Sequence, residues 1–151
     1  TGRHPIVQTY YAHNFVLIDD QPVGPAYRVT FREPMTPDRD LLGIAGIEGR
    51  VLTFNRELRD RILVFNRELM KAETVYTQFV EHDLDAAWNG ALVENTATGA
   101  GIRITGDRPL SRFHFWATRL AVCPEPFVAI DIAPGETFRW KDTYELLVNE
   151  N

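Results

Sequence analysis

Cysteine is almost missing from this sequence, because Cys123 is the only one among its 151 residues. A single thiol excludes an internal disulfide and leaves no cluster of thiolates for a structural zinc ion. A chain without disulfides fits a reducing compartment, so the sequence slightly favours the cytoplasm and otherwise leaves the location open.

The sequence also lacks a long apolar segment and a cluster of basic residues. No apolar run approaches the roughly 18 residues of a membrane span. Lys and Arg, 16 in number, are outnumbered by 21 Asp and Glu, which gives a net charge of −5. The basic residues are scattered, whereas a nucleic-acid-binding surface gathers them into a stripe or patch. We therefore expect neither a membrane nor a nucleic acid as partner.

The sequence is rich in short runs of β-branched and aromatic residues separated by Gly, Pro, Asn and Asp. Hydrophobic residues make up 44%, enough for one globular domain over residues 1–151. Many short strands with turns between them predict an all-β fold, an antiparallel β-sandwich. The expected strands cover residues 5–11, 14–18, 26–31, 51–54, 62–65, 74–79, 92–95, 101–105, 111–120, 127–132 and 136–148.

Residues 54–69 are open to two interpretations. FNREL occurs at 54–58 and again at 65–69, and the apolar residues between them follow a helical spacing. Against a helix, VLTF and ILVF are β-rich tetrads, and ELRDR between them suits a hairpin connection. The sequence alone leaves both alternatives, a helix and a hairpin.

The motif TYYAHNF at residues 9–15 surrounds His13 with aromatic residues. One interpretation is an edge or core histidine bonded to a backbone carbonyl. The other is a general acid held in place by its neighbours. Tyr11 and Asn14 lie beside it in the chain and are candidates for substrate binding.

In CPEPF at residues 123–127, two prolines flank Glu125. Pro126 pushes the residue before it into an extended backbone, and Pro124 has a fixed φ. A structural interpretation is an extended corner at the mouth of a strand. A functional one is a general base whose side chain is aimed repeatably by the two prolines.

SRFHFWATRL at residues 111–120 alternates between two kinds of side chain. Phe113, Phe115 and Ala117 predict a core face, and His114 and Trp116 fall on the other face. An imidazole beside an indole suits stacking on the C–H face of a sugar while also offering a hydrogen bond, so both are candidate substrate-binding residues. A purely structural tryptophan is the alternative.

No spacing in the chain matches a phosphate-binding loop, a zinc-protease helix, a nucleophile elbow or a calcium loop. EHDLD at residues 81–85 gathers acidic residues around His82, and we interpret it as a solvated turn rather than a metal site. The sequence therefore predicts no metal and no organic cofactor.

Several blocks together resemble the galactose-mutarotase-like superfamily, in particular its aldose-1-epimerase-related members. They are YYAHNF, FHFW, CPEPF, the alternating FVAIDI, PGETFRW and the closing TYEL. The resemblance implies a supersandwich of antiparallel sheets that binds a sugar without metal or cofactor. It places Glu125 as the general base on the anomeric hydroxyl and His13 as the acid on the ring oxygen. Asp83 and Asp85 are weak candidates for the aspartate that holds a sugar hydroxyl.

The resemblance covers the C-terminal half of that family's domain, so a partial supersandwich lacking its N-terminal half is expected. Half of such a fold would leave sheet edges uncovered, which predicts a homodimer or association with the missing half. The function implied is opening and reclosing of a sugar hemiacetal. Two alternatives stay open: a non-catalytic carbohydrate-binding module on the same fold, and a structural β-domain that docks another protein.

Overall fold

The structure, a computed structural model, describes residues 2–39, 62–64 and 69–148. In these ranges the chain is all-β, with two antiparallel sheets, which confirms the predicted fold class at this level. The one helical element described is a single 3₁₀ turn, η1 (Ala86–Trp88). No helix in the same ranges has the length and apolar character needed to cross a membrane.

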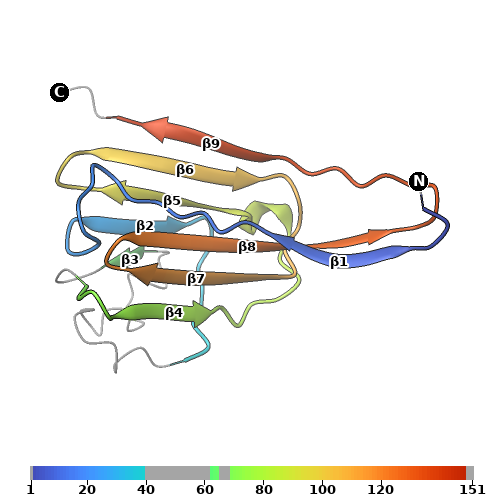
Figure 1. Ribbon diagram of the computed structural model, residues 1–151, viewed down its shortest axis with the longest axis horizontal. Helices are drawn as coiled ribbons and strands as arrows, with labels where there is room; N and C mark the ends of the chain where they lie inside the picture. Colours follow the sequence, from blue (N-terminus) through green and yellow to red (C-terminus); the bar gives the residue numbers. More distant parts are fainter. Residues whose placement is uncertain (1, 40–61, 65–68, 149–151) are drawn as a thin grey trace.

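The two sheets contain four and five strands, which are labelled in Figure 1, and buried residues of both sheets share one core. In the four-stranded sheet the order is β1 (Ile6–Tyr11), β8 (Ala121–Ile132), β7 (Arg112–Thr118), β4 (Thr74–Gln78). In the five-stranded sheet it is β3 (Ile62–Val64), β2 (Tyr27–Phe31), β5 (Gly90–Asn95), β6 (Ala100–Gly106), β9 (Asp142–Leu147). β1 and the paired end of β8 extend together beyond the other strands (Figure 1).

The core lies between the sheets and is centred on aromatic side chains. Phe31 of β2 makes edge contacts with Phe79, Phe113 and Phe115, at ring-centroid distances of 5.0, 5.5 and 6.2 Å. Each of the four is at most 1% exposed. Edge-to-face packing of this kind adds to the free energy gained from burying the rings. The alternation predicted for residues 113–117 is therefore confirmed, since Phe113, Phe115 and Ala117 all face this core.

Most of the expected strands are present, with shifted ends. One prediction was wrong in a way that matters: CPEP is not a corner before a strand, because residues 123–126 lie inside the twelve-residue β8. The expected strand at 14–18 is reduced to one bridge, Val16 with Val122. The last strand begins at Asp142, so residues 136–141 precede it outside regular structure.

The ambiguous stretch at 54–69 is described only in part. Residues 62–64 form the short strand β3, paired antiparallel with β2. This is the conformation expected of the hairpin interpretation at those three residues. The expected strand at 51–54 and the rest of the stretch up to residue 68 lie outside the described residues.

A buried tyrosine ties the loop after β1 to the core, and it gives the first testable prediction. Tyr27 is 0% exposed, and its hydroxyl accepts from the backbone N–H of Ile18 at 2.8 Å while lying 2.9 Å from the carbonyl oxygen of Gln21. Tyr27→Phe leaves that buried N–H without a partner, so we expect a loss of about 1–3 kcal/mol in the free energy of unfolding. Urea denaturation measures it. Tyr11→Phe, on a side chain 43% exposed, is the control and should cost far less.

Candidate functional site

His13 and Glu125 meet directly, although they are 112 positions apart in the chain. Nδ1 of His13 lies 2.7 Å from Oε1 of Glu125. The side chain of His13 is 50% exposed, whereas that of Glu125 is 9% exposed. The pair therefore has one buried end and one end that is open to solvent.

The backbone explains why these two side chains meet. Tyr11 pairs with Phe127. Val16, five residues later, pairs with Val122, which is five residues before Phe127, so the register is the same on both sides of the unpaired residues 12–15. In that register His13 lies opposite Glu125. Residues opposite each other on antiparallel strands point to the same face, with their Cβ atoms roughly 4.5–5.5 Å apart.

The two prolines explain why the ladder stops between these pairs. Val16 and Val122 exchange two backbone hydrogen bonds, one in each direction. Every second residue of β8 from Val122 onward therefore points its N–H and C=O groups toward the chain that contains residues 12–16. Pro124 and Pro126 occupy the next two such positions and have no N–H to donate. Residues 12–15 are thus held beside β8 without the usual bonds. Asn14 substitutes a side chain, donating from Nδ2 to the carbonyl oxygen of Pro124 at 2.9 Å.

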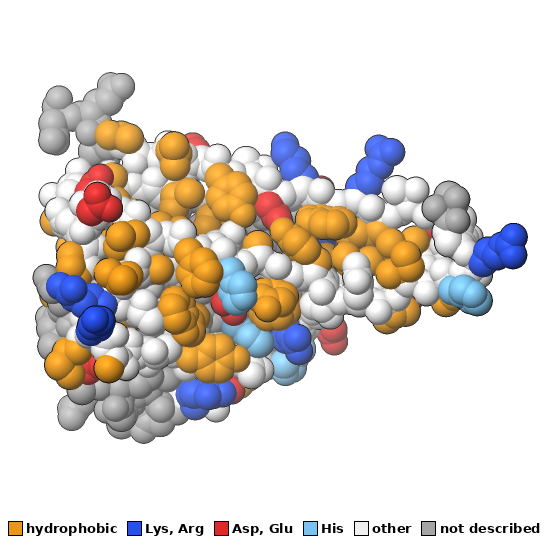
Figure 2. Space-filling view, in the orientation of Figure 1, with side chains coloured by type: hydrophobic (Ala, Val, Ile, Leu, Met, Phe, Trp, Pro, Cys, Tyr) orange, Lys and Arg blue, Asp and Glu red, His pale blue; other side chains and the backbone are white. Residues whose placement is uncertain are grey.

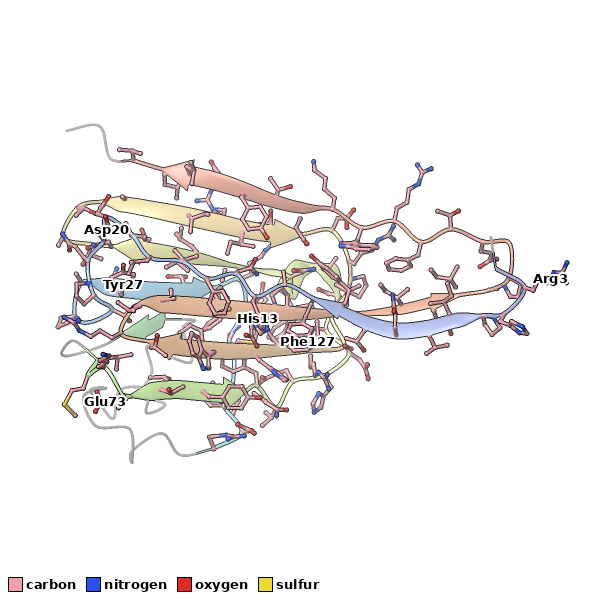
Figure 3. All side chains as sticks on the ribbon, in the orientation of Figure 1. Arg3, His13, Asp20, Tyr27, Glu73 and Phe127 are labelled. Atoms are coloured by element: carbon pink, nitrogen blue, oxygen red, sulfur yellow. The ribbon has the colours of Figure 1, made fainter. Side chains whose placement is uncertain are left out.

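Aromatic rings surround the exposed end of the pair. The ring of His13 stacks on the ring of Phe15, with 5.3 Å between the ring centroids. It also makes an edge contact with the ring of Tyr11, at a centroid distance of 4.9 Å. Phe15 in turn contacts Trp116 of β7 at 5.6 Å, and Tyr11 stacks on Phe127 at 4.5 Å. Figure 2 shows histidine side chains among hydrophobic ones near the middle of this view, and Figure 3 shows His13 and Phe127 close together there. We call this side of the four-stranded sheet the aromatic face.

His114 lies on the aromatic face, opposite Glu125 in the β7–β8 ladder. It is 8% exposed, and its Nδ1 is 3.3 Å from the hydroxyl of Tyr76. Its Nε2 is a buried atom that has no hydrogen-bond partner among the described residues. Burial, and then the positive charge of Arg112, lower the pKa of His114. A neutral imidazole with one nitrogen unpaired among the described residues therefore lies next to Glu125.

Cys123 completes the buried end of the site. Its side chain is 0% exposed, and its Sγ lies 3.5 Å from Oε1 of Glu125. Burial, followed by the nearby carboxylate, raises the pKa of this thiol. The protein alone therefore keeps Cys123 as a thiol at neutral pH, which makes it a poor nucleophile.

The structure brings five of the six candidate residues to one face: His13, Glu125, Tyr11, His114 and Trp116. Asn14 differs, because both ends of its amide are used within the protein. Besides its bond to Pro124, its Oδ1 accepts from the hydroxyl of Tyr144, on β9, at 2.7 Å. Asn14 therefore holds the segment that carries His13.

The acidic segment EHDLD, residues 81–85, lies away from the cluster around His13 and Glu125. Asp85 caps η1, accepting from the backbone N–H of Ala87 at 2.8 Å. His82 and Asp83 are exposed, and Asp83 adopts a positive φ of 52°. Neither Asp83 nor Asp85 is part of the cluster around His13 and Glu125.

At one side of the aromatic face, Arg39 covers the ring of Tyr76, with its guanidinium carbon 5.0 Å from the ring centroid. Asp38 fixes Arg39 through two hydrogen bonds of 2.8 Å and accepts another from the backbone N–H of Gln78 at 3.2 Å. The hydrogen bond from Arg39 is the main cause that lowers the pKa of Asp38 to about 2. This carboxylate thus connects residues 38 and 39 to β4.

The lowered pKa of Asp38 predicts a pH dependence of stability. A carboxyl whose folded-state pKa, about 2, lies below its ordinary value of 3.8 stabilises the fold above pH 3.8. That contribution disappears as the pH falls from about 4 to about 2. We therefore expect the difference in free energy of unfolding between wild type and Asp38→Asn to narrow over this interval, as measured by urea denaturation. Asp131→Asn, on an exposed side chain, is the control and should show no such narrowing.

Sequence reasoning missed Cys123, Phe15, Phe127 and Tyr76. For two of them a signal was available, because Cys123, Glu125 and Phe127 alternate in the chain and share one face of a strand. Treating the prolines as a corner concealed that alternation. Phe15 and Tyr76 gave no comparable signal, since they reach the site from segments whose pairing the sequence does not show.

Comparison with known proteins adds no family assignment to this geometry. No protein-family model matches the chain, and no curated protein and no solved structure matches it either. The resemblance to the mutarotase-like superfamily therefore stays a prediction.

Proposed function

We propose that the aromatic face binds a carbohydrate and that His13 and Glu125 transfer protons to and from it, as in an aldose 1-epimerase. The observation that carries this proposal is the 2.7 Å contact between an exposed imidazole and a buried carboxylate, ringed by aromatic side chains. Opening a hemiacetal requires one general base at the anomeric hydroxyl and one general acid at the ring oxygen, and neither needs to be a strong nucleophile.

The surroundings of the pair favour a sugar over a wholly apolar ligand. Sugar rings present C–H faces that pack on aromatic rings and hydroxyl groups that need hydrogen-bond partners. Phe15, 60% exposed, and Trp116 supply ring surface beside His13. The unused Nε2 of His114 supplies a hydrogen-bonding atom on the same face. A mixture of apolar surface and a few fixed polar groups is typical of small-molecule sites.

The proposed reaction uses the atoms that the contact leaves available. Both described contacts of the Glu125 carboxylate fall on Oε1, and His13 uses only Nδ1. The carboxylate accepts the proton of the anomeric hydroxyl while Nε2 of the protonated imidazole donates to the ring oxygen, and the bond between the anomeric carbon and that oxygen breaks. The aldehyde then rotates. Ring closure reverses both transfers, so the pair returns to its starting state and the other anomer leaves.

The decisive experiment is to add the full chain to a freshly dissolved single anomer and follow its interconversion by polarimetry or NMR. A panel of aldoses, including uronates and phosphorylated sugars, covers the substrate classes. Acceleration above the spontaneous rate supports the proposal. Binding of a sugar without acceleration identifies a carbohydrate-binding module instead. If no sugar binds or reacts, the proposal fails and a structural β-domain that docks another protein remains.

A further inference from the structure

We propose that His13, Cys123 and Glu125 form a binding site for a zinc ion. One donor atom from each of them, an imidazole nitrogen, the thiol sulfur and a carboxylate oxygen, lies within 4.8 Å of the other two. No sequence spacing suggests this site, because its donors come from opposite ends of the chain. The fold alone brings them together.

The distances between the donors are close to those that zinc requires. Zinc binds nitrogen and oxygen at about 2.0–2.2 Å and sulfur at about 2.3 Å, in a tetrahedral arrangement that spaces its ligands roughly 3.3–3.6 Å apart. Sγ of Cys123 is already 3.5 Å from Oε1 of Glu125, and Nδ1 of His13 is 2.7 Å from the same oxygen. A shift of the His13 imidazole by about an ångström would bring the nitrogen–oxygen distance into this range, and all three donor atoms already lie within 4.8 Å of one another.

The two donors on β8 are held in place, whereas the imidazole of His13 can move. Cys123 and Glu125 are two residues apart on β8, a central strand, so their side chains share a face in a fixed relation. His13 belongs to the segment that the two prolines leave without ladder bonds to β8. Asn14 holds the neighbouring backbone, so the adjustment falls to the half-exposed side chain of His13, which can rotate. Two donors are therefore preorganised and the third can adjust by rotation.

The types of donor select the kind of metal. Zinc binds a thiolate, so the ion would displace the proton of Cys123 into solvent on binding. Thiolate sulfur together with imidazole favours zinc or a similar transition metal over magnesium or calcium, which prefer oxygen ligands. Three protein ligands leave the fourth position for water, as in sites of the catalytic type. His114, which faces Glu125 across the β7–β8 ladder, has an unused buried Nε2 that can bond such a water. The aromatic rings beside His13 supply apolar surroundings on that side of the site.

Zinc binding would regulate the proposed reaction, and this part rests on the proposed function. The ion would occupy Nδ1 of His13 and Oε1 of Glu125. The imidazole could then not carry protons on both nitrogens, as the proposed acid must, and the carboxylate would be a weaker base. We therefore expect zinc to inhibit mutarotation and a chelator to restore it.

Zinc binding itself is tested without any sugar. Isothermal titration of the full chain with zinc chloride should show one ion bound per chain. Second-shell changes alone weaken metal sites by about 10- to 100-fold, so the loss of a direct ligand in Cys123→Ser should weaken binding by more than about 100-fold. His13→Asn should act in the same direction, and because His13 is half exposed this variant puts little strain on the fold. His4→Asn, on an exposed side chain near the start of the chain, is the matched control and should bind as the wild type does.

Cobalt gives a second, spectroscopic measurement of the same site. Co²⁺ bound to the wild type should show a near-ultraviolet charge-transfer band from sulfur to metal, and Cys123→Ser should lack it. The proposal is overturned if the wild type binds no stoichiometric zinc, or if both ligand variants bind it as tightly as the wild type. Neither result depends on sugar chemistry, so the zinc site and the proposed function can fail separately.

Discussion

Glu125→Gln is expected to lower the rate of mutarotation by about 100- to 10,000-fold, the usual contribution of general acid–base catalysis. The amide keeps the shape of the side chain and an oxygen that can face His13, but it cannot take the proton of the anomeric hydroxyl. Affinity for the sugar should change much less, because stacking on the aromatic rings is untouched. The rate of anomer interconversion and the dissociation constant of the sugar, measured on the same preparation, separate these two effects.

Glu136→Gln is the matched control for this substitution, since Glu136 is exposed and is not in the cluster around His13. Its rate should equal that of the wild type. A Glu125→Gln protein that is folded, binds sugar and still interconverts anomers at the wild-type rate would remove Glu125 from the mechanism. Circular dichroism and urea denaturation establish that the variant is folded, which matters because the residue is 7% exposed.

Phe31→Ala is expected to lower the free energy of unfolding by about 3–5 kcal/mol, the usual cost of removing a large buried ring. Phe31 is 1% exposed and contacts three other core rings, from the segments of β4 and β7. Removing it leaves a cavity between the two sheets and deletes three of the ring contacts that join them. This amount is a large fraction of the 5–15 kcal/mol that stabilises a typical domain.

Equilibrium urea denaturation followed by tryptophan fluorescence is the measurement for this prediction. Phe15→Ala is the control, because it removes the same ring from a position that is 60% exposed. It should cost well under half as much in the free energy of unfolding, although it should weaken sugar binding. Equal losses for the two variants would mean that the stacked sheets do not depend on the aromatic core described here.

The strands were the most predictable part of the fold, and the reason is periodicity. In FHFWA the alternating residues Phe113, Phe115 and Ala117 identified the core face correctly, because a side-chain period of two is a property of the backbone itself. Strand ends were less predictable. The final strand was expected from residue 136, but the pairing of β9 with β6 begins only at Asp142, and the sequence does not encode where a partner strand ends.

The misplacement of CPEP has a specific cause. Prolines are usually confined to edge strands or strand ends, since they cannot donate to a ladder. In β8, however, Pro124 and Pro126 turn their nitrogens toward residues 12–15, where the ladder is interrupted, while the residues between them turn toward β7. One side of the strand therefore keeps its regular pairing. The rule that proline is excluded from central strands does not distinguish the two edges of a strand, so it could not predict this arrangement.

The candidate site was predictable only in part. Local spacing could suggest His13 and Glu125 separately, and the resemblance to a known family paired them. Their contact depends on the register between β1 and β8, which links residues 112 positions apart. The participation of Cys123 depends on that register together with burial, and neither property is visible in a single sequence.

The prolines of β8 have one more consequence. Because Pro124 and Pro126 offer no amide hydrogen to residues 12–15, the position of this segment depends strongly on the hydrogen bonds that Asn14 makes with Pro124 and Tyr144. Asn14 thus positions the segment, whereas His13 and Glu125 carry the proposed chemistry. An engineer could adjust how far the imidazole reaches by altering Asn14 or Tyr144, and leave the proton-carrying groups themselves unmodified.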